Sequence, residues 1–124
     1  MGPETPFAAR AEARNGVARI ALSGELDMAT VPSLLEPRTR FEQNGVTAIM
    51  LDLREVTFLD MSGLNALLRA RDRASTNGHR LVLVGASRPA RRLLELTGTQ
   101  LLFDEQDAIS VVDRFTGASP SSRQ

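Results

Sequence analysis

Four residues whose side chains could take part in chemistry lie in two loops that follow strand-like segments. Glu25 and Asp27 stand in the segment SGELD, and Asp60 and Ser62 stand in TFLDMSGL. In an open α/β sheet, the loops at the carboxyl ends of the strands gather at one edge, where ligands and partners bind. If the two strands are neighbours, the three carboxylates and the hydroxyl lie together. They could form an acid cluster or present a hydroxyl to another protein.

Ser62 is the residue that we single out, because the sequence predicts that a helix begins there. The unpaired N–H groups and the dipole at a helix start favour an anion, so a phosphate on the Ser62 oxygen would be tolerated. An ordinary N-cap serine occupies the same kind of position without any further function. Gly63 favours the functional interpretation, because a missing side chain lets another protein approach the hydroxyl.

The composition excludes several kinds of site. All 15 basic residues are Arg, the chain has no Lys, Cys, Trp or Tyr, and His79 is the single histidine. The absence of Lys excludes a P-loop phosphate clamp and a Schiff base. The absence of Cys excludes a thiol nucleophile, a disulfide and a thiolate zinc site.

The charge balance predicts protein partners, with no direct binding to nucleic acid or a membrane. The 15 basic residues are matched by 15 acidic ones, which gives a formal net charge of zero and a pI near 6.6. A balanced chain lacks the basic footprint that nucleic acid or anionic lipid attracts. No apolar run approaches the roughly 20 residues that a membrane-spanning helix needs. We therefore expect a cytoplasmic protein.

The first half of the chain predicts a hairpin followed by an alternation of helix and strand. Asn15-Gly16 is a strong signal for a type I′ turn, since both turn residues need positive φ, and Val17 to Leu22 follow as a strand. A helix should start after Thr30 as its N-cap and either be kinked or restart at Pro37. Thr47 to Leu53 form an apolar run of strand length, typical of a strand covered on both faces.

The second half continues this alternation. We expect a helix over Ser62 to Asn77, a buried strand over Leu81 to Val84, and a helix capped by Ser87 that faces inward through Thr97 and ends at Gly98. A short strand, Leu101 to Phe103, should precede a last helix. Apolar positions of that last helix recur at helical spacing, at Ala108, Val111, Val112 and Phe115.

This order predicts an α/β fold with one mixed, mostly parallel sheet, packed helices and an antiparallel hairpin at its N-terminal end. A single domain should span 7–116, between flexible ends at 1–6 and 117–124 that are rich in Gly, Pro and Ser. The core should contain six apolar side chains: Ile49, Leu51, Leu67, Leu83, Leu93 and Val112.

Several segments closely resemble the STAS domain of bacterial anti-sigma-factor antagonists. They are, in order, SGELD with MATVPSL, IMLDLREVTFLDMSGLNALL and LVLVGASRPARRLLELTG. The resemblance extends over about Val17 to Phe115. Its most specific part is FLDMSGL, because the family shows an Asp, one or two small hydroxyl residues, Gly and Leu at these positions. The resemblance implies a single STAS domain.

The resemblance also implies a phosphorylation switch without a cofactor of its own. The serine before the glycine, here Ser62, is phosphorylated by an anti-sigma factor that is also a serine kinase, and a serine phosphatase restores the unphosphorylated form. The residue before it is commonly Ser or Thr, whereas this chain has Met61. The implied partner-binding surface contains Glu25, Asp27, Thr30, Asp60, Met61, Gly63 and Leu64.

Two other functions compete with the switch. Some STAS proteins are scaffolds of stress-signalling complexes or accessory subunits of membrane transporters, and they bind whatever their phosphorylation state. A small enzyme could instead use Glu25, Asp27 and Asp60 as an acid cluster with a metal. That second alternative is weak, because three carboxylates without a base, a nucleophile or a lysine specify no reaction. Asp27 and Asp60 each also have a structural role open to them, as residues that shape a turn.

Overall fold

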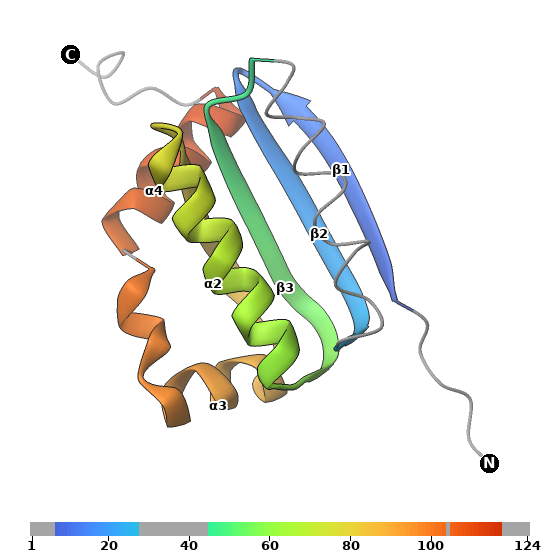
Figure 1. Cartoon of the computed structure of the whole chain (residues 1–124). Helices are drawn as coiled ribbons and strands as arrows, with labels where there is room; N and C mark the ends of the chain where they lie inside the picture. The colour runs from blue at the N-terminus through green and yellow to red at the C-terminus, as the bar shows by residue number, and fades with distance from the viewer. Residues whose placement is uncertain (1–6, 28–44, 104, 118–124) are drawn as a thin grey trace.

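In the computed structural model of this chain, a four-stranded sheet lies between helices (Figure 1). The structure describes residues 7–27, 45–103 and 105–117. The sheet has the order β1-β2-β3-β4, with strands Ala8–Arg14, Val17–Leu26, Ala48–Leu59 and Arg80–Ala86. β1 is antiparallel to β2, and the other neighbouring pairs are parallel. The predicted mixed, mostly parallel sheet with an N-terminal hairpin is confirmed.

The hairpin turn has the geometry that its sequence predicts. Asn15 and Gly16 have φ angles of 56° and 75°, which are the left-handed values of a type I′ turn. Arg14 pairs with Val17 on either side of the turn, and the register continues to Ala8 opposite Ser23. The twist of this turn matches the twist of the two strands, so it fixes their register.

Three helices complete the described fold: α2 over Met61–Thr76, α3 over Arg88–Thr97 and α4 over Glu105–Thr116. α2 lies on one face of the sheet and α4 on the other, while α3 lies at the end where α2 begins (Figure 1). Each face has its own apolar cluster. Ile20, Leu51 and Leu67 belong to the cluster under α2, and Met50 and Phe115 belong to the cluster under α4.

The predicted core residues divide into two groups. Ile49, Leu51 and Leu67 are fully buried. Leu83, Leu93 and Val112 are half-buried and pack against the two apolar clusters. β4 stands at one end of the strand order, which leaves its residues less covered than those of β3. Thr97, which was expected to face inward, is exposed.

Two strands are longer than the sequence predicts. Ser23 to Leu26 continue β2, and Thr57 to Leu59 continue β3, where loops were expected. The register shifts between Ala21 and Ser23 and between Gly24 and Glu25. Such irregularities let a strand continue where its strict alternation of apolar and polar residues breaks down.

The predicted strand Leu101 to Phe103 is wrong. Thr99–Leu102 form a single 3-10 turn, named η1, and Leu101 is 83% exposed. The Thr97 hydroxyl donates to the Leu93 carbonyl, which keeps the chain turned at the end of α3.

Other predictions fall on residues outside those that the structure describes. They are the helix after Thr30 with its kink or restart at Pro37, the end at 1–6, and all but Gly117 of the end at 117–124. The domain bounds 7–116 therefore remain a prediction.

A buried carboxylate stabilises the α4 side of the sheet. Asp52 on β3 is 5% exposed. Arg19 Nη2 on β2 donates to its Oδ2 at 2.7 Å, and Arg54 donates from Nε at 2.9 Å and from Nη2 at 2.6 Å. The hydrogen bonds from Arg54, opposed by burial, lower the pKa of Asp52 from 3.8 to about 2. These contacts give Asp52 a structural role.

Candidate functional site

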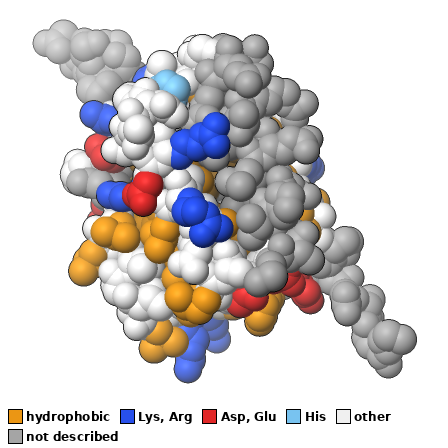
Figure 2. Space-filling view, viewed as in Figure 1, with side chains coloured by type: hydrophobic (Ala, Val, Ile, Leu, Met, Phe, Trp, Pro, Cys, Tyr) orange, Lys and Arg blue, Asp and Glu red, His pale blue; other side chains and the backbone are white. Residues whose placement is uncertain are grey.

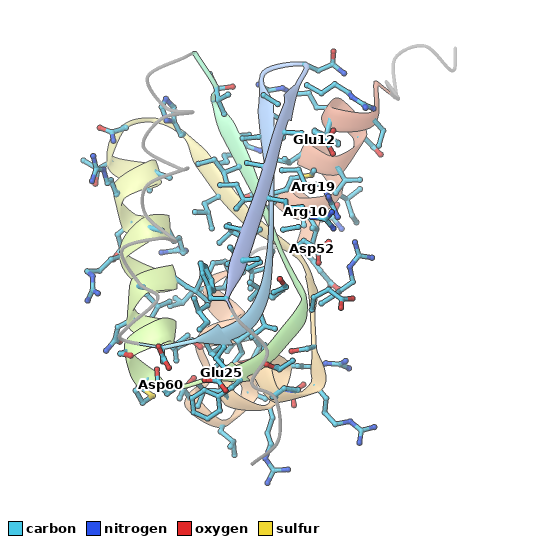
Figure 3. The ribbon with its side chains drawn as sticks, turned by 90° about the vertical axis from the view of Figure 1, so that its right-hand side faces the viewer. Arg10, Glu12, Arg19, Glu25, Asp52 and Asp60 are labelled. Atoms are coloured by element: carbon cyan, nitrogen blue, oxygen red, sulfur yellow. The ribbon has the colours of Figure 1, made fainter. Side chains whose placement is uncertain are left out.

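The parallel pairing of β2 and β3 brings the two predicted loops together. Leu26 pairs with Leu59, and Glu25 pairs with Phe58. Both strands therefore end at the same edge of the sheet, where α2 begins. Glu25 and Asp60 lie at this lower end of the sheet in Figure 3, away from Asp52. We call the exposed region around the start of α2, formed by Glu25, Phe58, Asp60, Met61 and Ser62, the α2-start surface.

Asp60 is the N-cap of α2. Its Oδ1 accepts the Gly63 N–H at 2.9 Å, and its backbone carbonyl accepts the Leu64 N–H at 2.9 Å. The helix begins at Met61, one residue before the expected start, and its N-cap is Asp60, two residues before the candidate cap Ser62. Asp and Ser cap helices about equally well, so only the backbone geometry decides between them. Ser62 therefore lies inside the first turn of α2, and its hydroxyl is not used for capping.

The Ser62 hydroxyl is held by the same carboxylate. Ser62 Oγ donates to Asp60 Oδ1 at 2.8 Å, and the serine is half-buried. Hydrogen bonds from the Gly63 N–H, the Ser62 hydroxyl and the Ser62 N–H lower the pKa of Asp60, against the opposing effect of burial. The carboxylate is therefore ionised at neutral pH, and its charge keeps the serine side chain in one orientation.

A glycine is required at position 63 because α2 packs closely there, and not because a partner needs access to the Ser62 hydroxyl. A Cβ at this position would lie 2.4 Å from the Leu26 carbonyl oxygen and 2.8 Å from Leu59 Cδ1. Leu64, the next residue, has no exposed area. Both residues were predicted to contact a partner, but they are buried, so they can affect the α2-start surface only from beneath. The glycine sets how closely α2 approaches the ends of β2 and β3.

Two apolar side chains stand exposed on the α2-start surface. Phe58 is 47% exposed and Met61 is 51% exposed. Figure 2 shows apolar side chains at the lower end of this view, with acidic side chains beside them. Phe58 was not among the predicted site residues. Its signal was its place in FLDMSGL, where an aromatic residue lies two positions before the capping aspartate.

Two predicted site residues, Asp27 and Thr30, lie in the chain that follows Leu26, the last residue of β2. Asp27 follows β2 and is half-buried, and Thr30 lies outside the described residues. Within the described ranges, no three His, Cys, Asp or Glu side chains are grouped so that they could hold a metal ion. Glu25, Asp27 and Asp60 thus do not form the metal-binding acid cluster of the enzyme alternative. Of the helices in residues 45–103 and 105–117, none has the length and apolar character of a membrane span.

Comparison with known families places most of the chain in one of them. The model of the STAS domain matches residues 8–111. An anti-sigma-B factor antagonist of Staphylococcus aureus (strain NCTC 8325) is 32% identical over 92 residues, which cover 74% of this chain and 85% of that protein. A protein of the same name from Staphylococcus epidermidis is 28% identical over 92 residues, with the same coverage of both chains.

Solved structures show the same fold. An anti-sigma factor antagonist from Mycobacterium paratuberculosis has a TM-score of 0.72 and 27% identity, covering 86% of this chain and 94% of that one. The Bacillus cell fate determinant SpoIIAA in its phosphorylated form has a TM-score of 0.63 and 25% identity, covering 85% of this chain and 99% of that one.

Proposed function

Because this chain belongs to the STAS domain family, we propose that it is an anti-sigma-factor antagonist whose binding is switched by phosphorylation of Ser62. The observation that carries the proposal is the placement of the Ser62 hydroxyl, which Asp60 orients at 2.8 Å on a surface with two exposed apolar side chains. The names of the relatives support antagonism, and the phosphorylated form of SpoIIAA supports the modification.

In the unphosphorylated form, the α2-start surface binds the anti-sigma factor and so releases the sigma factor for transcription. Phe58 and Met61 supply its exposed apolar area, and such side chains dominate binding energies when a partner desolvates them. Glu25 and Asp60 add acidic groups at the same end of the sheet, and these favour a partner with basic residues. Asp27, which follows β2, would extend this surface, and Thr30 remains a predicted partner contact outside the described residues.

The anti-sigma factor in this proposal is also a serine kinase, which uses its own ATP and magnesium. It transfers the terminal phosphoryl group of ATP to Ser62 Oγ, while the hydroxyl proton leaves to the kinase and ADP is released. Asp60 acts as a positioning residue in this step, because it fixes the direction of the hydroxyl. The antagonist itself contributes no cofactor and no catalysis.

A phosphate on Ser62 meets little compensating positive charge. The Ser62 and Gly63 N–H groups, which an anion at a helix start would use, already donate to the Asp60 carboxylate. The phosphate adds roughly −1.5 to −2 charge beside the Asp60 carboxylate. A like-charge contact or an unpaired charge in a desolvated interface costs several kcal/mol, and about 3 kcal/mol corresponds to a hundredfold loss of affinity.

The switch requires a second partner that removes the phosphate. We propose a serine phosphatase that acts on the phosphorylated form and returns the protein to its binding state. We place the cycle in the cytoplasm, because its other components act on the transcription machinery there.

Mass spectrometry of the purified protein, after incubation with lysate of its source cells and ATP, tests this proposal. We expect one phosphate on Ser62, no phosphate in Ser62→Ala, and unchanged phosphorylation in Ser75→Ala, which alters an exposed serine at the far end of α2. A pull-down under the same conditions should recover a kinase. Phosphate on another residue, or recovery of a transporter or of other STAS proteins without a kinase, would contradict the proposal.

A further inference from the structure

β1 forms one edge of the sheet, and its outer side has no strand beside it in the part of the chain that the structure describes. Six of its seven residues are exposed. The strand faces the viewer in Figure 3, with Arg10 and Glu12 projecting from the same face. An edge strand with free backbone groups is a template for another strand.

The hairpin turn determines which backbone groups are free. A two-residue turn closes on a hydrogen-bonded pair, here Arg14 and Val17, and hydrogen-bonded pairs then recur at every second residue. Arg14, Glu12 and Arg10 therefore direct their backbone groups toward β2. The N–H and C=O groups of the residues between them, Ala9, Ala11 and Ala13, point outward from the sheet.

We propose that a second copy of this chain pairs with β1 through its own β1, antiparallel, with Ala11 of one copy opposite Ala11 of the other. In this register the outward N–H and C=O groups of Ala9 meet those of Ala13, and the two Ala11 residues exchange their own bonds. A two-fold axis perpendicular to the sheet relates the copies, and the four-stranded sheet doubles.

The charges of β1 are complementary in this register. Arg10 of each copy stands opposite Glu12 of the other, at positions that are not hydrogen-bonded pairs, where facing side chains approach most closely. Arg14 stands opposite Ala8 and meets no charge. Charged side chains on an edge strand normally prevent pairing, but here they select one arrangement.

Neighbouring registers are disfavoured by the same residues. A shift of two residues in one direction places Arg10 opposite Arg10, and a shift in the other direction places Glu12 opposite Glu12. Like charges directly opposite each other destabilise a strand pair. The register centred on Ala11 also keeps all of β1 paired, from Ala8 to Arg14.

Arg10 and Glu12 are available for these contacts. Arg10 has no ion pair within 4.0 Å among the described residues, whereas Glu12 makes two contacts near that limit, at 3.9 Å to Arg14 and at 4.0 Å to Arg19. Such long, exposed ion pairs contribute little to stability and can be exchanged.

Sedimentation equilibrium of the purified full chain tests the proposal, at protein concentrations up to about 1 mM, the weak end of specific association. We expect a monomer–dimer equilibrium for the wild type. Arg10→Glu and Glu12→Arg should each weaken dimerisation at least about tenfold, because each places like charges opposite each other. An equimolar mixture of these two variants should restore the dimer, since both facing pairs then have opposite charges.

Two further kinds of variant make the outcome specific. Ala11→Pro removes an outward N–H and should weaken the dimer, yet a proline is tolerated on the free side of an edge strand. Arg92→Glu and Glu95→Arg make the same charge changes on exposed positions of α3 and should leave association unchanged. Circular dichroism melting checks that each variant is folded. A wild type that stays monomeric, or folded variants that dimerise as well as the wild type, would overturn the proposal, as would a mixture that stays monomeric.

Discussion

The middle and the carboxyl end of β3 each present an aspartate that accepts several hydrogen bonds, but the two sites differ in what surrounds them. Asp52 lies in the middle, buried, and its partners are two arginine side chains, one of them from β2. Asp60 follows the strand, and its partners are a hydroxyl and a backbone N–H of the next three residues. The first carboxylate ties two strands together, and the second shapes a surface.

This difference teaches how a functional aspartate can be told from a structural one in this fold. The Asp52 carboxylate is buried and paired with two guanidinium groups, so the carboxylate itself is not available to a partner. The charge of Asp60 faces no cation in the contacts that orient Ser62, and exposed apolar side chains lie beside it. Substitutions in the middle of β3 should therefore change stability, whereas substitutions at its end should change binding.

The largest effect on stability is expected for Asp52→Ala. This substitution leaves Arg19 and Arg54 without their carboxylate. Breaking a buried ion pair costs about 3–5 kcal/mol, but these arginines can bind water in its place. We therefore expect the free energy of unfolding to fall by about 3 kcal/mol. Urea unfolding measures it. Glu12→Ala, which removes a carboxylate with only long contacts, is the control and should cost less than about 1 kcal/mol. Equal losses of unfolding free energy in Asp52→Ala and Glu12→Ala would show that the buried position of Asp52 adds nothing to its effect on stability.

Gly63→Ala should have the next largest effect. The new Cβ would meet the Leu26 carbonyl at 2.4 Å, so α2 or β2 must shift. Overpacking costs about 1–3 kcal/mol, and a contact with a backbone oxygen belongs at the upper end of that range. The better helix propensity of Ala returns up to about 1 kcal/mol, so we expect a net loss of about 2 kcal/mol. Thermal unfolding measures it, with Asn65→Ala on the exposed side of α2 as a control that gains helix propensity without a new close contact and should lose no stability. A melting temperature equal to that of the wild type would show that the close approach is not required.

The pH dependence of stability sharpens the comparison. The pKa of Asp52 is lowered from 3.8 to about 2, so the folded state holds its proton less tightly than the unfolded chain. Its stabilising contribution is therefore complete above pH 3.8 and is lost as the pH falls from 3.8 through about 2. Urea unfolding at several pH values should show this decline, and Asp52→Asn should reduce it. An unchanged slope in Asp52→Asn would contradict the structural role of this carboxylate.

Asp60 should affect stability less. Asp60→Ala removes an N-cap, which typically costs about 1 kcal/mol, whereas Asp60→Asn keeps a good capping side chain and should cost only a few tenths. Thermal unfolding compares the two. In the phosphorylation assay, Asp60→Asn should slow modification of Ser62, because the neutral amide holds the hydroxyl less firmly. If both variants melt like the wild type, and Ser62 is phosphorylated in them as fast as in the wild type, Asp60 neither caps α2 nor positions Ser62.

Local patterns predicted the parts of the fold that local chemistry determines. Asn15-Gly16 predicted the turn, and the apolar run from Thr47 predicted an inner strand. The sequence left open whether β2 and β3 are neighbours, and the structure shows that they pair in parallel. The strand predicted at Leu101 failed because three apolar residues do not distinguish a strand from a helical turn. The lengths of β2 and β3 depend on register shifts, which leave no clear pattern in the sequence.

The site was predictable in its position but not in its contacts. The motif around Ser62 indicated the correct region. Whether Asp60 or Ser62 caps α2, however, depends on backbone angles that either residue can adopt. The tight contact of Gly63 with Leu26 joins residues far apart in the chain, so a local reading could not find it. The same holds for the pairing of Asp52 with Arg19 across two strands.

The central claim is that Ser62 controls binding and not folding. Calorimetric titration of the purified anti-sigma kinase with Ser62→Ala and Ser62→Asp tests it most directly, with Ser75→Asp as a control for an added charge at the far end of α2. We predict wild-type affinity for Ser62→Ala and Ser75→Asp, and about a hundredfold weaker binding for Ser62→Asp. Ser62→Asp should melt only a few degrees below the wild type, because it loses the hydrogen bond to Asp60 but keeps a negative charge in the first turn of α2. Equal affinities of the Ala and Asp variants, or a strongly destabilised Ser62→Asp, would contradict it.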